Sequence, residues 1–293
     1  MKKLPTRIFG KTGKSVSVLG LGAMPMSVDG RPSEEDCLQV LKCAFELGVT
    51  FIDTADAYCL NEHEKHHNER LIEIAIERYG NPKTVFVATK GGLMRPEGRW
   101  ETNGDPKHLE KTIGESYQAL GGQRPIFLWQ FHSPDPKFPI KESLKAARDA
   151  VEKGLVLYVG VSNFSVKQIE EAREVVDIVS VQNQYSPFHR QPENDGVLDY
   201  CEKENLVFLP WSPYGGWYRY EKLRQLSTLD RIASKHDRSV YQAVLAWLRQ
   251  KSPCVLPIPG ASQLETLENS MAGFDFVLSD EECEKLDQEF SVL

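Results

Sequence analysis

Four polar side chains stand where short apolar runs of the sequence end, and their types suit proton transfer. Asp53, Lys90 and His132 each end one such run, and Tyr58 follows Asp53 by five residues. A buried ammonium needs a carboxylate partner, which Asp53 can supply to Lys90. A cation beside a phenol favours the phenolate, so we expect Lys90 to lower the pKa of Tyr58 and make it a general acid. His132 can donate a hydrogen bond to the same substrate oxygen.

Eight short apolar runs, rich in Val, Ile and Phe, alternate with longer amphipathic segments. Each run is too short for a helix and is bounded by Gly, Pro or polar residues. The runs cover residues 16–20, 50–53, 84–90, 126–132, 157–162, 178–182, 206–211 and 254–258. Alternation of apolar strands with helices indicates a parallel sheet, and eight units in 293 residues predict a closed (β/α)8 TIM barrel.

Helix-start signals fill the intervals between the predicted strands. A cap followed by acidic residues predicts a helix after Ser33, and Tyr241 opens a strongly amphipathic stretch. Further helices are expected at Pro106, Ser165, Ser262 and Ser279. Residues 7–16 have the pattern of a β-hairpin that caps the bottom of the barrel. No linker interrupts the alternation, so residues 1–293 are expected to form a single domain.

Active sites of such barrels lie at the carboxyl ends of the strands. The polar residues at the predicted strand ends are Asp53, Lys90, His132, Ser162, Asn163, Gln182, Trp211 and Ser212. We therefore expect these side chains to meet at one mouth. Trp129 and Trp247 are assigned to packing, because strand and helix periodicity directs them away from the mouth.

The overall composition excludes several classes of partner. The chain has 35 Lys and Arg against 42 Asp and Glu, a net charge of −7, with 41% hydrophobic residues. This balance gives no electrostatic footprint for nucleic acid or an anionic membrane. There is no signal-peptide pattern and no apolar run long enough to span a bilayer. The six scattered cysteines contain no C-x-x-C and are expected to be reduced thiols of a cytoplasmic protein.

Six sequence blocks resemble, in order, motifs of the aldo-keto reductase family. The blocks are residues 48–58, 88–90, 130–132, 160–164, 182–187 and 257–260. The resemblance implies a catalytic tetrad of Asp53, Tyr58, Lys90 and His132. It also implies reduction of a small aldehyde or ketone to an alcohol by hydride transfer from NAD(P)H, with Tyr58 protonating the oxygen.

The same resemblance implies how the cofactor binds. Ser162, Asn163 and Gln182 would hold the nicotinamide carboxamide, Trp211 would stack on the ring, and the backbone of residues 212–216 would wrap the pyrophosphate. The full set of expected cofactor-binding residues is Gly22, Ala23, Ser162, Asn163, Gln182, Trp211, Ser212, Pro213, Tyr214, Gly215, Gly260, Ser262, Gln263, Glu265, Glu268 and Asn269.

The last cofactor block departs from the family pattern. Many relatives have Lys or Arg at the positions of Ser262 and Glu265, where these side chains bind the 2′-phosphate. A carboxylate instead prefers a ribose 2′-hydroxyl. Glu265 has an equally simple explanation as an acidic residue in the first turn of its helix. The resemblance slightly favours NADP(H), and use of NAD(H) or of both cofactors stays open.

Two other functions remain as alternatives. Residues 63–67 spell the H-E-x-x-H zinc motif, but that motif needs a buried helix and a third ligand, so a solvated loop is favoured and no metal is predicted. A metal-dependent barrel hydrolase would use this cluster with His132. A cofactor-binding regulatory subunit with little turnover is the other alternative. The sequence leaves protein partners undetermined. Trp217, Tyr218 and Tyr220 are candidates for a lid or pocket wall.

Overall fold

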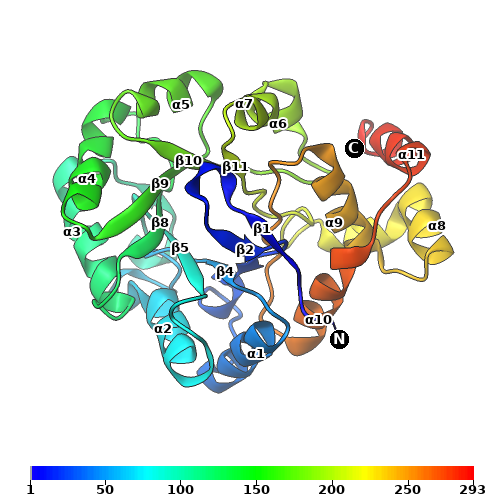
Figure 1. The fold of residues 1–293 in the computed structure, drawn as a ribbon, viewed down its shortest axis with the longest axis horizontal. Coiled ribbons are helices and arrows are strands. Elements are labelled where there is room, and N and C mark those ends of the chain that lie inside the picture. Colours follow the sequence, from blue (N-terminus) through cyan, green and yellow to red (C-terminus); the bar gives the residue numbers. More distant parts are fainter. Residues whose placement is uncertain (1) are drawn as a thin grey trace.

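A parallel sheet curled around the centre of the molecule carries the fold (Figure 1). The computed structural model describes residues 2–293. Seven strands follow one another around the sheet in chain order. They are β3 (Leu21–Gly22), β4 (Phe51–Asp53), β5 (Phe86–Gly91), β8 (Ile126–Phe131), β9 (Val156–Ser162), β10 (Ile178–Gln182) and β11 (Val207–Phe208).

Residues 254–260 close the sheet between its two edge strands. On one side Phe208 N–H donates to the carbonyl of Cys254 at 3.0 Å, and on the other Gly22 N–H donates to the carbonyl of Pro259 at 3.0 Å. Leu256 N–H also donates to the carbonyl of Phe208 at 2.9 Å, but Pro257 and Pro259 have no N–H, so this segment does not form a regular ladder. The predicted (β/α)8 barrel is therefore confirmed, with its eighth strand reduced to isolated bridges.

An N-terminal hairpin covers one end of the barrel, as predicted. β1 (Thr6–Ile8) and β2 (Ser15–Ser17) pair antiparallel. The predicted first barrel strand, residues 16–20, is wrong in its bounds, because its first residues belong to the hairpin. Ser17 bends the chain here: its Oγ donates to the carbonyl of Leu19 at 2.7 Å and its N–H donates to Thr50 Oγ1 at 2.7 Å. The first barrel strand therefore starts only at Leu21.

Helices surround the curled sheet on its outer side (Figure 1). They are α1 (Glu34–Glu46), α2 (His67–Tyr79), α3 (Pro106–Ala119), α4 (Ile140–Glu152), α5 (Val166–Arg173), α6 (Gln191–Asn194), α7 (Val197–Lys203), α8 (Ser227–Lys235), α9 (Val240–Lys251), α10 (Leu264–Ala272) and α11 (Asp280–Phe290). Ser33, Ser165 and Ser279 are N-caps, as the sequence indicates. Ser262 is not a cap, because α10 begins one residue later than expected and has Gln263 at its N-cap.

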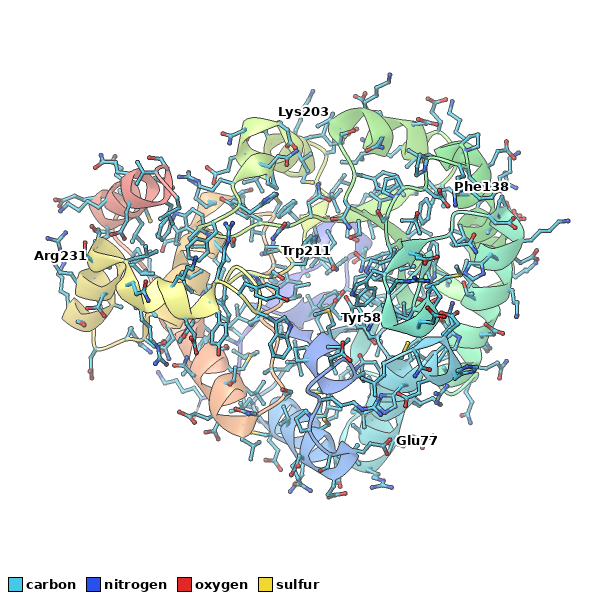
Figure 2. The ribbon with its side chains drawn as sticks, turned by 180° about the vertical axis from the view of Figure 1, so that it is seen from behind. Tyr58, Glu77, Phe138, Lys203, Trp211 and Arg231 are labelled. Carbon is cyan, nitrogen blue, oxygen red and sulfur yellow. The ribbon has the colours of Figure 1, made fainter. Side chains whose placement is uncertain are left out.

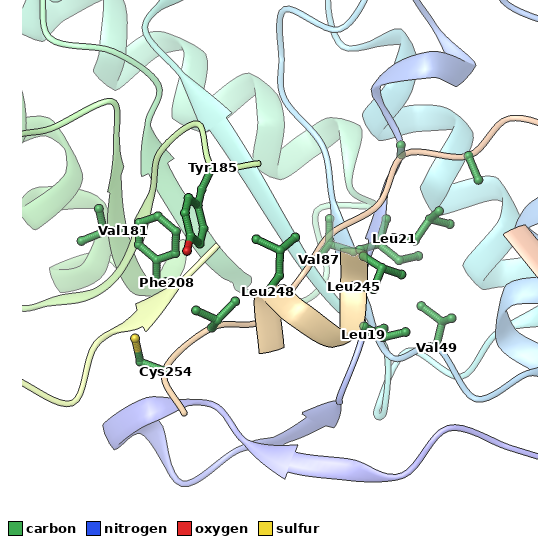
Figure 3. Packing of buried hydrophobic residues seen from close by; sticks show 14 of the residues in the cluster. Leu19, Leu21, Val49, Val87, Val181, Tyr185, Phe208, Leu245, Leu248 and Cys254 are labelled. Atoms are coloured by element: carbon green, nitrogen blue, oxygen red, sulfur yellow. The ribbon is translucent and has the colours of Figure 1, made fainter. Parts of the chain in front are cut away.

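Two apolar clusters stabilise the barrel. Inside its lower end, Phe9 of the hairpin stacks on Phe51, with ring centroids 5.2 Å apart, and packs against Phe127. Between sheet and helices, Leu245 and Leu248 of α9 join side chains from several strands (Figure 3). Trp129 and Trp247 are fully buried, which confirms their assignment to packing. The polar strand ends lie at the opposite end from the hairpin.

Candidate active site

A buried ammonium joins the ends of the second and third barrel strands. Lys90 Nζ lies 2.7 Å from Asp53 Oδ2, 2.9 Å from Tyr58 Oη and 2.8 Å from the carbonyl oxygen of Thr54. Lys90 is fully buried, and Asp53 is 3% and Tyr58 6% exposed. All three protons of the ammonium thus have an acceptor. The structure brings together the three residues that the sequence analysis placed at one site.

The loop after β4 positions Tyr58 by following the neighbouring strand. Thr54 N–H donates to the carbonyl of Ala88 at 2.8 Å, and Asp56 N–H donates to the carbonyl of Lys90 at 3.0 Å. The hydroxyl of Thr54 bonds Asn68 Oδ1 of α2 at 2.5 Å, which ties the same loop to the outer helix. These contacts fold the chain back over β5, so the phenol arrives above the Lys90 side chain.

Burial, rather than the nearby cation, decides the protonation of Tyr58. Removal from water raises the pKa of Tyr58, and the attraction of Lys90 for a phenolate does not reverse that rise. The expectation that Lys90 lowers the pKa below its usual value is therefore wrong. For Lys90, burial lowers the pKa, but Asp53 and Tyr58 outweigh it and the net pKa is raised. The site thus holds a protonated phenol beside a charged ammonium.

His132 faces the phenol as a neutral imidazole. Its ring centroid lies 5.9 Å from that of Tyr58, with the two planes at 78°. Burial, helped by the positive charge of Lys90, lowers the pKa of His132 well below its usual value. Its Nδ1 is buried and has no partner among residues 2–293. His132 therefore has a ring nitrogen that is free to form a hydrogen bond, on a ring that packs beside the phenol of Tyr58.

Two glutamines hold the second oxygen of Asp53. Gln182 Nε2 donates to Asp53 Oδ1 at 2.7 Å, and Gln130 Nε2 lies 3.4 Å from the same oxygen. No role was predicted for Gln130 from the sequence, although a polar residue within the apolar run 126–132 was a usable signal. Gln182, which was predicted to bind the nicotinamide carboxamide, donates to Asp53 through Nε2, and its contact with the cofactor stays a prediction. Both glutamines keep the carboxylate hydrogen-bonded within the barrel.

Three predicted cofactor residues form one connected group beside His132. Ser162 Oγ donates to the carbonyl of Gln182 at 2.7 Å, and Asn163 Nδ2 donates to the carbonyl of His132 at 3.0 Å. Trp211 Nε1 donates to Asn163 Oδ1 at 3.0 Å, which fixes the indole next to the strand ends. Tyr58 and Trp211 both lie in the central part of the face seen in Figure 2.

The segment after Trp211 has a backbone suited to an anion. Ser212, Gly215 and Gly216 have φ angles of 50°, 88° and 74°. Turns with such left-handed residues direct backbone N–H groups into a concave face that binds phosphate groups. A side chain at Gly215 would meet Phe188 at 2.5 Å, so only glycine fits there. The Gly215 N–H is used inside the turn, where it donates to the carbonyl of Ser212 at 2.8 Å. Binding of the pyrophosphate by this segment stays a prediction. Tyr214 secures the segment through a 2.9 Å hydroxyl bond to Ser270.

The remaining predicted cofactor residues lie where residues 254–260 close the barrel, in the segment after Trp211, or at the start of α10 and along it. Gly22 pairs with Gly260, and Ala23 N–H donates to the carbonyl of Asp53 at 2.9 Å, so this part of the seam lies beside the candidate tetrad. Pro213 is buried. On α10 and its cap, Gln263, Glu265 and Glu268 are exposed and Ser262 is half-buried. Asn269 differs from these, because its oxygens accept hydrogen bonds from Gln242 of α9.

The histidines of the H-E-x-x-H sequence take separate partners. His66 Nδ1 bonds Glu69 at 2.5 Å, and His67 Nδ1 bonds Ser27 at 2.8 Å. His63 lies in the single turn η3 (Glu62–Glu64). Within residues 2–293 there is no group of three or more His, Cys, Asp or Glu side chains that is arranged to hold a metal ion.

Comparisons with known proteins agree with this geometry. The model of the aldo/keto reductase family matches residues 18–289. An uncharacterized oxidoreductase of Schizosaccharomyces pombe is 36% identical over 94% of this chain and 87% of its own. An NADP(+) aldo-keto reductase of the same yeast is 30% identical over 94% of this chain and 88% of its own. The crystal structure of a thermostable aldo-keto reductase bound to epalrestat, 31% identical, covers 97% of this chain and 99% of its own with a TM-score of 0.82.

The barrel and its polar mouth define an oxidoreductase of the nicotinamide-dependent class. The chain belongs to the aldo/keto reductase family and is an NAD(P)H-dependent enzyme that reduces carbonyl groups of small molecules. None of the helices in the described part of the chain has both the length and the apolar character to cross a membrane.

Proposed function

We propose that Tyr58 is the general acid of carbonyl reduction in this enzyme, supported by Lys90, Asp53 and His132. The observation that carries this proposal is the position of Lys90 Nζ, 2.9 Å from Tyr58 Oη and 2.7 Å from Asp53 Oδ2. We further propose that residues 1–293 act as one domain, since every group in this proposal belongs to the same barrel. We also propose that the protein is cytoplasmic, in line with its six free cysteines.

Each of the four side chains has a separate proposed role in the transfer of one proton to the substrate. The reduced nicotinamide, when bound, supplies a hydride to the carbonyl carbon. Tyr58 gives its proton to the carbonyl oxygen, and the Lys90 ammonium stabilises the phenolate that remains. Asp53, held by Gln182, keeps the buried ammonium charged. His132, which is neutral, orients the same oxygen through a ring N–H.

The polar group at the mouth fits the nicotinamide end of the cofactor. Asn163 is exposed, and its amide donates a hydrogen bond to the carbonyl of His132 and accepts one from Trp211 Nε1. These two bonds hold the amide at the mouth, next to the aromatic surface of the indole. Ser162 and the backbone of residues 212–216 complete the proposed binding surface. Gln182, the third residue expected to hold the carboxamide, ends the neighbouring strand β10 and donates to Asp53 through Nε2.

We propose NADP(H) as the cofactor, in line with the NADP(+) relative from yeast. One observation favours NAD(H) as a second candidate: Glu265 is exposed on α10 at a position where relatives have a basic residue. A carboxylate there repels a 2′-phosphate. Dissociation constants of NADPH and NADH for the wild type and Glu265→Arg decide between them. The variant is expected to bind NADPH about tenfold more tightly, with Glu170→Arg on α5 as the matched charge control.

The central experiment follows nicotinamide absorbance with the purified protein. We expect oxidation of NADPH or NADH in the presence of a reactive aldehyde such as 4-nitrobenzaldehyde. Tight cofactor binding without turnover on any aldehyde or ketone would favour the regulatory-subunit alternative instead. The intact arrangement of Tyr58, Lys90 and Asp53 argues against that alternative, because a binding subunit needs no buried proton donor.

A further inference from the structure

A half-exposed tryptophan stands directly beside the proposed proton donor. Trp100 is 46% exposed, and its ring centroid lies 6.4 Å from that of Tyr58 with the planes at 87°. It belongs to a hairpin inserted after β5, in which β6 (Leu93–Met94) pairs antiparallel with β7 (Glu101–Thr102). Because β5 also supplies Lys90, the hairpin places this indole at the same mouth as the ammonium.

A buried guanidinium holds the Trp100 ring. Arg95 is 2% exposed, and its Cζ lies 4.0 Å from the centroid of the Trp100 ring. Its Nε is buried and has no partner among residues 2–293. Its Nη2 lies 3.4 Å from the carbonyl of Leu60 and 3.9 Å from a carboxylate oxygen of the exposed Asp29. The indole face therefore lies against this buried charge and stabilises it together with the Leu60 carbonyl and the Asp29 carboxylate.

The same arginine ties the hairpin to the loop that follows Tyr58. The backbone N–H of Arg95 donates to Glu62 Oε2 at 2.8 Å, and Glu62 lies four residues after Tyr58. The orientation of the indole is thus coupled to the loop that carries the phenol. The indole therefore packs against a buried cation that is itself bonded, through its backbone N–H, to the loop after Tyr58.

We propose that Trp100 is a specificity-determining residue that selects planar aromatic carbonyl substrates, and that Arg95 is the residue that positions its ring. The inference rests on the proposed role of Tyr58. Both Trp100 and His132 stand nearly perpendicular to the phenol, at 87° and 78°. An aromatic aldehyde that places its oxygen at the Tyr58 hydroxyl gains an aromatic neighbour in Trp100, whereas a saturated ring of the same size lacks that interaction.

The test compares two aldehydes of nearly equal size, benzaldehyde and cyclohexanecarbaldehyde. The ratio of their kcat/KM values is measured for the wild type, Trp100→Leu and Trp100→Phe. We expect Trp100→Leu to lower the benzaldehyde preference about tenfold, equivalent to about 1.4 kcal/mol. Trp100→Phe should keep the ratio within about threefold of the wild type. An equal change for both aldehydes in Trp100→Leu would overturn the inference, because a merely structural role affects both alike.

Arg95 is tested by Arg95→Met, which keeps the length of the side chain and removes the buried charge. We expect the ratio to fall in the same direction as in Trp100→Leu, by about threefold, because the indole is no longer held. In the double variant Arg95→Met/Trp100→Leu, the loss of the arginine should add nothing further to the ratio. A full additional loss in the double variant would show that Arg95 does not act through Trp100.

A binding measurement separates failure of this inference from failure of the proposed function. Benzyl alcohol and cyclohexylmethanol are titrated into the protein and followed by ligand-observed NMR. Trp100→Leu should weaken binding of benzyl alcohol several-fold and leave cyclohexylmethanol nearly unchanged, whether or not the enzyme turns over. If the enzyme reduces no aldehyde but Trp100→Leu still weakens only the binding of benzyl alcohol, the proposed role of Tyr58 is wrong and that of Trp100 stands. If Trp100→Leu weakens the binding of both alcohols equally, the proposed role of Trp100 is wrong.

Discussion

At the scale of single residues, burial controls the chemistry of the mouth. Lys90 is completely enclosed, so its charge depends on Asp53 and on the oxygens around it. The same enclosure keeps the proton on Tyr58, because a phenolate is costly away from water. A general acid has to hold its proton until the substrate oxygen becomes basic, and this environment meets that requirement at neutral pH.

Replacement of Tyr58, the proposed proton donor, is the most direct test at this scale. Tyr58→Phe removes only the hydroxyl and should lower kcat for carbonyl reduction by about 10²–10⁴-fold, the usual contribution of general acid catalysis. The dissociation constant of the cofactor should change by less than about twofold. Tyr158→Phe is the matched control, since Tyr158 lies in the apolar cluster at the hairpin end of the barrel. Normal reduction by Tyr58→Phe would show that another group supplies the proton.

The burial of Asp56 leads us to expect that the free energy of unfolding depends on pH. Asp56 is buried, neither of its oxygens has a hydrogen bond within residues 2–293, and Lys65 Nζ lies 3.4 Å from its Oδ2. Burial raises the pKa of Asp56 to about 7, although Lys65 and His66 oppose the rise. The unfolded carboxyl ionises near pH 4 and the folded one near pH 7. The free energy of unfolding should therefore fall as the pH rises between these values, by at most about 4 kcal/mol.

Urea unfolding at pH 4.5 and pH 8 measures this effect. Asp56→Asn should lose less stability than the wild type between the two pH values, because its side chain does not ionise. Asp29→Asn, at a highly exposed carboxyl, should behave like the wild type. His66 contributes a loss of stability in the same direction. Burial lowers the pKa of His66, but the bond and the charge of Glu69 outweigh burial, so the net pKa is raised. The stability that comes from the charged imidazole is therefore lost as the pH rises. Identical slopes for the wild type and Asp56→Asn would refute the proposed ionisation.

At the scale of elements, capping decides where the outer helices begin. Ser239 caps α9 with a reciprocal pair of bonds: its Oγ accepts from Gln242 N–H at 3.2 Å, and Gln242 Oε1 accepts from Ser239 N–H at 3.3 Å. The helix that follows buries Trp247 and the leucines that face the sheet. The start of α9 thus sets which of its residues reach the core.

Loss of this cap should cost measurable stability. Ser239→Ala should lower the free energy of unfolding by about 1 kcal/mol, the usual effect of an N-cap serine. Ser262→Ala is the natural comparison, because Ser262 precedes α10 without capping it, and we expect a change within about 0.5 kcal/mol. Denaturant titrations of both variants measure the difference. Equal losses in the two variants would contradict the cap assignment.

At the scale of the whole molecule, stability and chemistry occupy opposite ends of the barrel. Phe9 fills the hairpin end through contacts with Phe51 and Phe127, whereas Tyr58, the proposed proton donor, and its partners lie at the carboxyl ends of the strands. Barrels of this kind separate a packed bottom from a catalytic top. Substitutions at the two ends should therefore affect different properties.

Phe9→Ala tests this separation. Removal of a fully buried phenylalanine should lower the free energy of unfolding by about 3–5 kcal/mol. KM for the cofactor and for the aldehyde should stay within about twofold at temperatures where the variant is folded. Ile8→Ala, at a neighbouring side chain that is 54% exposed, should change stability by less than about 0.5 kcal/mol. A large rise in KM for Phe9→Ala would show that the two ends are coupled.

Much of this protein could be predicted from local patterns. The eight apolar runs identify the barrel, because each parallel strand must be apolar on both sides. Asp53, Lys90 and His132 were recognisable as site residues because the carboxyl ends of parallel strands meet at one face. The order of the motifs indicated the family. These features depend on residue type and spacing along the chain, which are complete in the sequence.

Other features depend on the environment that distant segments create. The direction of the pKa shift of Tyr58 follows from its enclosure, and no spacing along the chain reports enclosure. The amide of Gln182 meets Asp53 from a strand 129 positions away. The contact of Arg95 with Trp100 arises from the folded hairpin. The sequence by itself determined which groups can react, and the tertiary structure alone decided how solvent, charge and direction act on each of them.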